Sequence, residues 1–212
     1  AATDNAEPGV GLPLAGLLIL FALTFVPHSV QFAKILSSPQ IVVRARAPNG
    51  TLLWLDDYRE GYRWLRERTP EDARVLAWWD YGYQISALAN RTTLADGNTW
   101  NHEHIALLGR CLVSPEPEAH AIVRHLADYV LVITSRHSGV GGDDLDKSPH
   151  MARIAGSIYP QVNASAMQMD ADRQPSASMR QSLLYRLHSW NIVPEVPPPE
   201  AFEAASTTSK RR

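Results

Sequence analysis

The clearest hydrophobic pattern lies near the N-terminus, where no charged residue occurs between Glu7 and Lys34. Residues 14–26 are almost wholly apolar and show no amphipathic period. About 20 such residues, at about 1.5 Å each, cross a hydrocarbon core of about 30 Å. A buried core helix usually alternates with polar positions, and a cleaved signal peptide begins with basic residues, whereas Asp4 and Glu7 precede this segment. We therefore predict a transmembrane helix over residues 10–33, after an N-terminal flank of residues 1–9.

Short apolar runs alternate with helical patterns along the rest of the chain. Strand-like runs lie at residues 41–43, 74–78 and 128–134, and the last is the strongest because it is β-branched and bounded by polar residues. Helices are predicted over residues 99–112, 115–127, about 145–158 and 176–188, and from Asp56 onward. The helix after Asp56 is amphipathic, with Tyr58, Tyr62 and Leu65 on one face and its arginines elsewhere. The pattern predicts a mixed α/β globular domain over residues 34–193, with helices around short strands. A proline-rich tail, residues 194–212, is predicted to be disordered and unpacked.

The composition narrows the class of protein. With 212 residues, 45% of them hydrophobic, and a formal net charge of -2, the chain is too apolar for a disordered protein and lacks the basic excess of a nucleic-acid binder. A single cysteine, Cys111, excludes an intrachain disulfide and a cysteine zinc cluster. Since the sequence does not begin with Met, we expect further protein upstream.

Aromatic and acidic residues gather at the end of the second strand-like run, in Leu76-Ala-Trp-Trp-Asp-Tyr-Gly-Tyr-Gln-Ile85. One Trp on a strand is ordinarily a core residue, but two adjacent ones point to opposite faces, and Asp80 would need partners if it were buried. An indole N–H only donates, a carboxylate only accepts, and a Ser or Thr hydroxyl does both. The pattern therefore favours a site in which Trp78, Trp79 and Asp80 saturate one hydroxyl and reject ligands that lack it.

The pentapeptide Trp78-Trp-Asp-Tyr-Gly82 matches the signature of the oligosaccharyltransferase catalytic subunit, which transfers a lipid-linked glycan to Asn in Asn-X-Ser/Thr. Other stretches resemble the eukaryotic form: Asp57-Tyr-Arg-Glu60, Arg91-Thr-Thr-Leu94, Asn98-Thr-Trp-Asn101, Tyr129-Val-Leu-Val-Ile133, Gly142-Asp-Asp144 and Ser182-Leu-Leu-Tyr185. The resemblance runs from about Ile41 to Leu187 and therefore covers most of the chain.

The resemblance implies roles for residues in two motifs. The residues expected to bind the acceptor sequon are Trp78, Trp79, Asp80, Lys147 and Met151. Tyr81, Gly82 and Asp144 complete the motifs, and Tyr83 matches a position that meets the lipid-linked donor. Asp144, Lys147 and Met151 would share one helix face, with Met151 against the Thr methyl. Pro149 departs from the family pattern, and Ser148-Pro149 would make a good helix start, which would leave Lys147 just outside the helix.

Mg²⁺ or Mn²⁺ is implied for the whole enzyme, with its carboxylate ligands in upstream loops, so we predict no metal and no catalytic residue in this chain. Asp144-Leu-Asp146 resembles the Asp-x-Asp metal motif of many glycosyltransferases, but the motif is short and an aspartate there also fits helix capping. His102-Glu-His104 lacks the spacing of a helical zinc pair. Of the sequons that begin at Asn49, Asn90 and Asn163, Asn90 matches a position that carries glycan in relatives and is the expected glycosylation site.

The resemblance implies the acceptor-recognising C-terminal part of a glycosyltransferase that is inactive by itself. Its implied partners are an Asn-X-Ser/Thr polypeptide, a dolichyl-diphosphate oligosaccharide, the membrane and other oligosaccharyltransferase subunits, with no nucleic acid. It also implies the endoplasmic reticulum membrane with the domain in the lumen, whereas the flank with Lys34, Arg44 and Arg46 favours the cytoplasm. The alternative is a membrane-anchored, non-enzymatic module that binds peptide or glycan.

Overall fold

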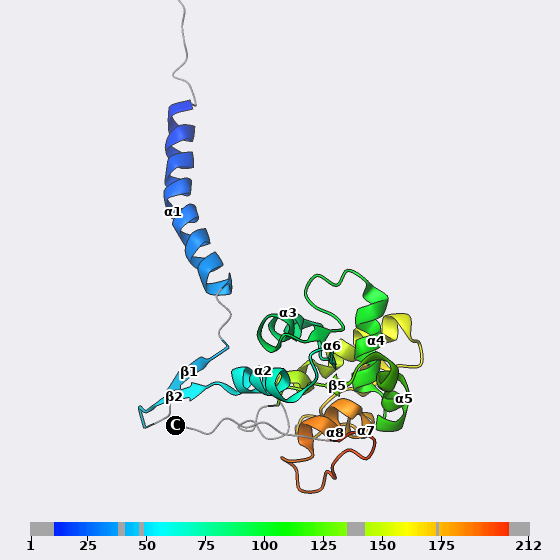
Figure 1. Ribbon diagram of the computed structural model, residues 1–212. Coiled ribbons are helices and arrows are strands. Elements are labelled where there is room, and N and C mark those ends of the chain that lie inside the picture. Colours follow the sequence, from blue (N-terminus) through cyan, green and yellow to red (C-terminus); the bar gives the residue numbers. More distant parts are fainter. Residues whose placement is uncertain (1–10, 38–40, 47–48, 135–142, 173, 204–212) are drawn as a thin grey trace, which may run out of the picture. The chain divides into compact units, whose positions relative to one another are not determined.

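The structure is a computed structural model that describes residues 11–37, 41–46, 49–134, 143–172 and 174–203. It divides into two compact units, residues 1–43 and 44–212, and each is described by itself (Figure 1). The expected mixed α/β class is confirmed, since the larger unit combines helices with short strands. The flank at residues 1–9 lies outside the described residues.

The smaller unit consists mainly of one helix, α1 (Gly11–Ser37), which contains Pro27. Its segment Pro13–Ile35 is long and apolar enough to cross a membrane by length and composition, and none of its most apolar window is buried. The helix ends at Ser37, later than the predicted end at residue 33. The large apolar side chains described between Leu14 and Ile35 are exposed on all sides of the helix, as expected for an apolar segment without an amphipathic period.

The boundary between the units falls within β1 (Val43–Arg46), which pairs with β2 (Leu52–Leu55) in a two-stranded sheet. Helix α2 (Asp57–Arg68) follows this sheet. The first strand starts at the last residue of the predicted run 41–43, so that prediction was misplaced along the chain. Helix α2 follows the predicted amphipathic pattern, because it buries Tyr62 and Leu65 and leaves its arginines exposed.

A three-stranded parallel sheet forms the centre of this unit, in the order β4 (Thr92–Thr93), β3 (Arg74–Leu76), β5 (Tyr129–Val130). Val75 pairs with Thr93 on one side and with Tyr129 on the other, and it is completely buried. The predicted seven-residue strand at 128–134 was wrong in length. Strand β3 ends at Leu76, whose carbonyl oxygen accepts the Leu131 N–H at 2.8 Å.

Helices surround this sheet (Figure 1). The chain passes from β3 through a 3₁₀ turn, η1 (Trp79–Tyr81), the short α3 (Gly82–Gln84) and a π-helical turn, η2 (Ile85–Ala89). The longer helices are α4 (His102–Val113), α5 (Glu116–Leu126) and α6 (Asp143–Ile158). Helices α4 and α6 approach closely, since a Cβ on Gly109 would lie 2.7 Å from the Met151 carbonyl oxygen.

The last predicted helix, at 176–188, is instead two helices, α7 (Ala177–Gln181) and α8 (Leu183–Ser189), which follow the one-turn η3 (Ala164–Ala166). Ser182 breaks the helix because its backbone is extended and bridges Pro115, while its hydroxyl accepts the Tyr185 N–H.

The described part of the proline-rich tail, residues 194–203, contacts the domain, so the prediction that it does not pack was wrong for these residues. Glu116 accepts the Ala201 N–H at 2.6 Å, and Arg186 donates to the Pro198 carbonyl oxygen at 3.0 Å. The His120 and Phe202 rings meet edge to face with centroids 5.2 Å apart. These residues form no helix or strand, and hydrogen bonds between their backbone groups and domain side chains hold them against the domain.

Candidate functional site

The two motifs singled out in the sequence meet at the carboxyl ends of the parallel strands β3 and β5. The turn η1 follows β3, and Ile133 follows β5, where its N–H donates to Asp144 Oδ2 at 2.9 Å. Asp144 lies in the first turn of α6, and its own N–H donates to the Ile133 carbonyl oxygen at 3.4 Å. Ligand sites of open parallel sheets form at this edge, because the loops that follow the strands converge there.

A hydrogen-bonded ion network joins the motifs. Lys147 Nζ lies 2.6 Å from Asp80 Oδ2, 2.7 Å from the Tyr81 hydroxyl and 3.5 Å from Asp144 Oδ1. The Tyr81 hydroxyl donates to Asp144 Oδ1 at 2.7 Å. One ammonium group is therefore held between two carboxylates and a phenol, and residues more than 60 positions apart are brought together.

Burial differs across the network. Asp144 and Tyr81 are buried, whereas the side chains of Asp80 and Lys147 are about one-third exposed. Desolvation raises the pKa of Asp144 to about 6, although the Ile133 N–H, Tyr81 and Lys147 each act to lower it. Burial, together with the Asp144 charge, raises the pKa of Tyr81 far above its usual range, so its hydroxyl stays a donor. The buried Asp144 and Tyr81 therefore fix the Lys147 ammonium group, while the Asp80 carboxylate is accessible to solvent.

The adjacent tryptophans do not lie on a strand, so the argument from opposite strand faces was wrong. Strand β3 ends at Leu76, and Trp79 begins the 3₁₀ turn, with the Trp78 and Trp79 ring centroids 6.4 Å apart. Trp78 is only 2% exposed and meets the His150 ring edge-on, which is the core role expected of a single Trp. Trp79 is half-buried, so it and Asp80 form the accessible part of the motif.

Lys147 lies inside α6 and not before it, so the expectation that Ser148-Pro149 starts the helix was wrong. The helix begins at Asp143, and the Ser148 hydroxyl donates to the Leu145 carbonyl oxygen instead of capping an N-terminus. Asp144 and Lys147 share a face as expected. Met151 is completely buried where α4 and α6 meet, so its contact with a Thr methyl remains a prediction.

Two glycines shape the segment around Tyr83. A Cβ on Gly82 would lie 2.2 Å from the Ala95 carbonyl oxygen, which explains a glycine at the end of the motif. A Cβ on Gly97 would lie 2.9 Å from the Tyr83 ring, which is itself about half exposed. Tyr83 is therefore accessible beside a close turn, and its contact with a lipid-linked donor remains a prediction.

The sequon at Asn90 lies at the end of the π-helical turn. Asn90 is exposed and has φ = 51°, in the left-handed region that asparagine tolerates best among non-glycine residues. Arg91 is buried and donates to five oxygens, including the Asn90 and Thr69 carbonyls. The exposed Asn90 side chain fits a glycosylation site, which remains a prediction along with the exposed Asn49 and Asn163.

Within the part of the chain that the structure describes, no three His, Cys, Asp or Glu side chains form a group that could hold a metal. Asp80 and Asp144 both pair with the Lys147 ammonium group, and the His102 ring lies 2.9 Å from the Ser157 hydroxyl. These residues do not fit a Mg²⁺ or Mn²⁺ centre, which prefers several oxygen ligands.

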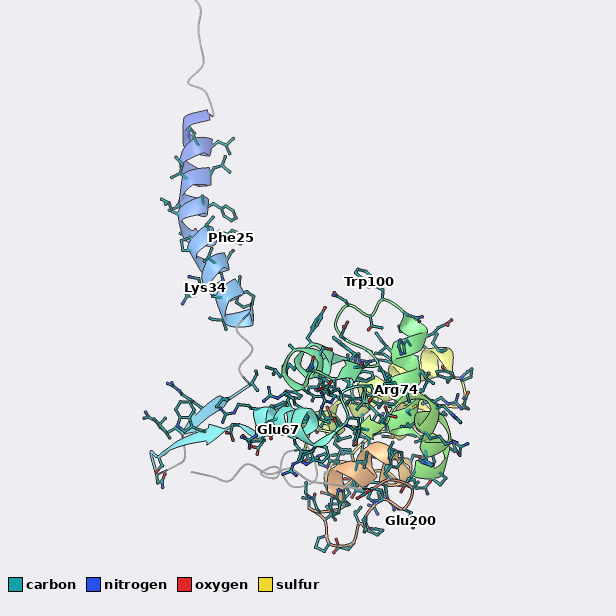
Figure 2. All side chains as sticks on the ribbon, viewed as in Figure 1. Phe25, Lys34, Glu67, Arg74, Trp100 and Glu200 are labelled. Atoms are coloured by element: carbon teal, nitrogen blue, oxygen red, sulfur yellow. The ribbon has the colours of Figure 1, made fainter. Side chains whose placement is uncertain are left out.

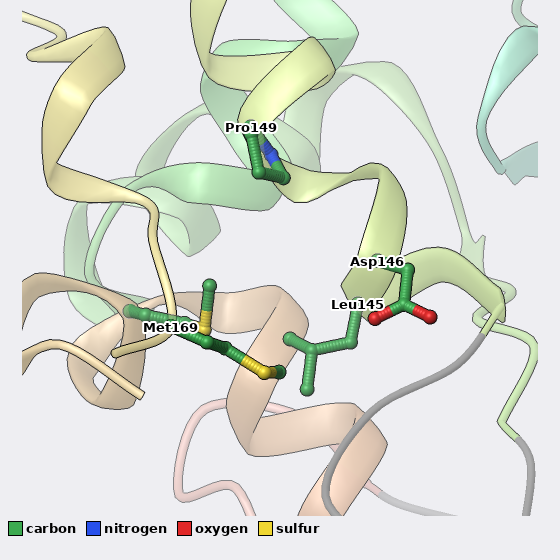
Figure 3. A pocket seen from close by; sticks show the side chains of 5 residues that line it. Leu145, Asp146, Pro149 and Met169 are labelled. Carbon is green, nitrogen blue, oxygen red and sulfur yellow. The ribbon is translucent and has the colours of Figure 1, made fainter. Parts of the chain in front are cut away.

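A separate hollow of about 280 Å³ lies beside α6, lined by Leu145, Asp146, Pro149, Met169 and Met179 (Figure 3). At 100° per residue, its α6 members lie on the opposite side of the helix from Asp144 and Lys147. The hollow is therefore distinct from the ion network.

Sequence reasoning missed the role of Tyr81 as the link between the motifs, and the part of Ile133 in binding Asp144. The position of a tyrosine within a motif does not reveal which group it hydrogen-bonds. A backbone N–H is present in nearly every residue type, so the sequence does not reveal its acceptor either. These groups meet only because β3 and β5 lie in one sheet and the segments that follow them converge at the same edge.

Known proteins of one family are similar to this chain over most of its length. Residues 71–197 match the model of the STT3/PglB/AglB core domain. The chain is 39% identical over 209 residues to the dolichyl-diphosphooligosaccharide–protein glycosyltransferase subunit STT3 of Saccharomyces cerevisiae, covering 95% of this chain and 28% of that protein. The corresponding subunit of Caenorhabditis elegans is 45% identical over 165 residues, which cover 75% of this chain and 22% of that protein.

Among solved structures, the C-terminal globular domain of an oligosaccharyltransferase from Archaeoglobus fulgidus matches with 19% identity and a TM-score of 0.42, over 65% of this chain and 84% of that one. The chain spans about a quarter of the length of the curated relatives it matches. With a family model matching more than half of its residues, the chain belongs to the STT3/PglB/AglB core-domain family.

Proposed function

We propose that this chain is the acceptor-recognising part of an oligosaccharyltransferase catalytic subunit. The intact enzyme would transfer a lipid-linked oligosaccharide from dolichyl diphosphate to Asn of Asn-X-Ser/Thr at the endoplasmic reticulum membrane, with α1 spanning the bilayer and the domain in the lumen. The names of the relatives support the reaction, and the apolar α1 supports the membrane location. A divalent metal and further subunits would belong to the intact enzyme, outside the described residues.

The single observation that carries the proposal is the ion network that places Asp80 at the surface. Its carboxylate accepts from Lys147 and retains lone pairs for a further donor. A Ser or Thr hydroxyl would donate to Asp80 and accept from the neighbouring indole N–H of Trp79. Lys147, held by Tyr81 and Asp144, fixes the carboxylate before the acceptor arrives, so little ordering entropy is lost on binding.

The proposed role is positioning and not bond making. Holding the hydroxyl of the Ser or Thr, two positions after the acceptor Asn, would orient the Asn carboxamide toward the sugar donor. Such orientation accelerates the transfer through proximity alone. A peptide with Ala in place of Thr leaves the Asp80 carboxylate without its hydrogen-bond donor, at a cost of about 1–3 kcal/mol.

Binding of acceptor peptides to the whole chain in lipid nanodiscs tests this proposal. We expect an Asn-X-Thr peptide to bind about tenfold or more tightly than Asn-X-Ala, and Asp80→Ala to remove the difference. Asp72→Ala is the matched control, since Asp72 is an exposed acid in the turn before β3. Equal binding of both peptides, or binding of glycan alone, would contradict the proposal and favour a non-enzymatic binding module.

A further inference from the structure

One face of the β1–β2 sheet carries exposed apolar and basic side chains that the acceptor site does not use. Arg44 and Arg46 are two positions apart on β1, and Leu52 and Trp54 are two positions apart on β2, so each pair points to one face of its strand. The Arg44 guanidinium lies over the Trp54 ring, 4.5 Å from its centroid, so residues of both strands share this face. Leu52 and Trp54 are nevertheless 53% and 51% exposed.

The covalent link to α1 limits how far this face can lie from the end of that helix. Helix α1 ends at Ser37 and β1 begins at Val43, so residues 38–42 separate them. A chain of that length reaches at most about 20 Å, even when fully extended. If α1 spans a bilayer, the sheet therefore lies within reach of the lipid headgroups at that end.

We propose that the face formed by Arg44, Arg46, Leu52 and Trp54, the hairpin face, rests on the headgroup region of a phospholipid bilayer. This proposal depends on the membrane-spanning role proposed above for α1. Its occupant is identified by chemistry: an indole prefers the boundary between headgroups and acyl chains, and arginine stems extend along apolar surface while their guanidinium groups bind phosphate.

The composition of the hairpin face favours lipid over a protein partner. The described residues of the face include two arginines and no acid, which suits phosphate oxygens. The apolar members described on this face are Leu52 and Trp54 on β2, with Arg44 and Arg46 beside them on β1, and two side chains are too few for the apolar core of a protein interface.

Tryptophan fluorescence of the whole chain in vesicles tests this inference. Of the six tryptophans, none lies in α1, so quenching by phosphatidylcholine brominated on its acyl chains reports only on the larger unit. We expect bromolipid to quench part of the emission, and Trp54→Phe to remove at least half of that quenched fraction. Trp100→Phe is the matched control, because Trp100 is 92% exposed and is expected to leave the fraction unchanged (Figure 2).

A second variant guards against a change in local structure at Trp54. Leu52→Asp keeps the indole but adds a charge to the hairpin face, and it should lower the quenched fraction by a similar amount. Unchanged quenching in Trp54→Phe, or loss of quenching in Trp100→Phe alone, would overturn the inference. Flotation separates the two proposals: a chain that floats with vesicles while Trp54 is unquenched keeps the membrane anchor and loses the hairpin face, whereas a chain that does not float loses both.

Discussion

At the scale of single residues, the candidate site depends on the balance of charge around Asp144. Its carboxylate is buried, yet it accepts from the Ile133 N–H and the Tyr81 hydroxyl and faces Lys147 and Asp80. Desolvation outweighs those contacts and raises its pKa to about 6. A carboxyl group whose pKa is raised on folding binds more protons in the native state, so its contribution to stability falls as the pH rises.

Replacing Asp144 with Asn should reveal this titration. Between about pH 4 and pH 6 the wild-type chain should lose up to about 3 kcal/mol of stability relative to Asp144→Asn, from a shift of about two pKa units, and above pH 6 the difference should be constant. Urea unfolding of both chains over pH 4–8 measures it. His188, whose pKa burial lowers to about 4, changes stability in the opposite direction in both chains and cancels in the comparison.

A difference between the two chains that does not vary with pH would show that Asp144 keeps an ordinary pKa. The same variant should weaken Asn-X-Thr binding above pH 6, because Lys147 loses one of the two carboxylates that hold it.

At the scale of elements, the position of η1 and α3 depends on how closely the chain packs after β3. The short helix α3 begins at Gly82, directly against the backbone of residues 95–96. A methyl group there meets the Ala95 carbonyl oxygen and the Asp96 Cα at 2.2 and 2.6 Å, which are backbone atoms that cannot move aside easily. Gly82 thus sets the position of the Trp79–Tyr81 turn.

Gly82→Ala should therefore destabilise the domain by about 1–3 kcal/mol and displace Asp80 from Lys147. Thermal unfolding measures the first effect, and the loss of preference for Asn-X-Thr over Asn-X-Ala measures the second. Gly16→Ala is the control, since a Cβ at Gly16 meets nothing within 4 Å. Wild-type stability in Gly82→Ala would mean that the 95–96 backbone yields.

At the scale of the whole molecule, the proline-rich tail joins the domain through a charge pair. The Glu116 carboxylate is buried, lies 3.1 Å from Arg186 Nη2 and accepts the Ala201 N–H. Since Arg186 also donates to the Pro198 carbonyl oxygen, the pair contacts the tail at two backbone groups. Cys111 is buried as well, and burial raises the pKa of its thiol to about 11, so this thiol stays protonated and unreactive near neutral pH.

Glu116→Gln should release the tail, because it leaves a largely buried guanidinium without its counter-charge, at a cost of about 3 kcal/mol. Hydrogen exchange at residues 200–203 should become faster, with the Ala201 amide most affected. Glu118→Gln, an exposed acid on the same helix, should leave the exchange rates unchanged. Equal protection in both variants would show that the tail stays on the domain without the charge pair, through contacts such as that of Phe202 with His120.

The sequence by itself determined the features that depend on local pattern. The uninterrupted apolar run predicts α1, the amphipathic period predicts α2, and the pentapeptide at Trp78 together with the Asp144–Met151 motif indicates both the family and the site. These features are local because hydrophobic period and motif spacing are written along the chain.

Only the tertiary structure decided which of those residues meet and which are accessible. Strand β3 ends at Leu76, β5 has only two residues, and Trp79 lies on a 3₁₀ turn. Met151 is buried where α6 meets α4, and the Glu116–Arg186 pair contacts the tail. Tyr81 meets Asp144 and Lys147, which are each more than 60 positions away along the chain. Burial and pairing between such distant segments depend on the packing of the whole domain, which no local pattern of residues encodes.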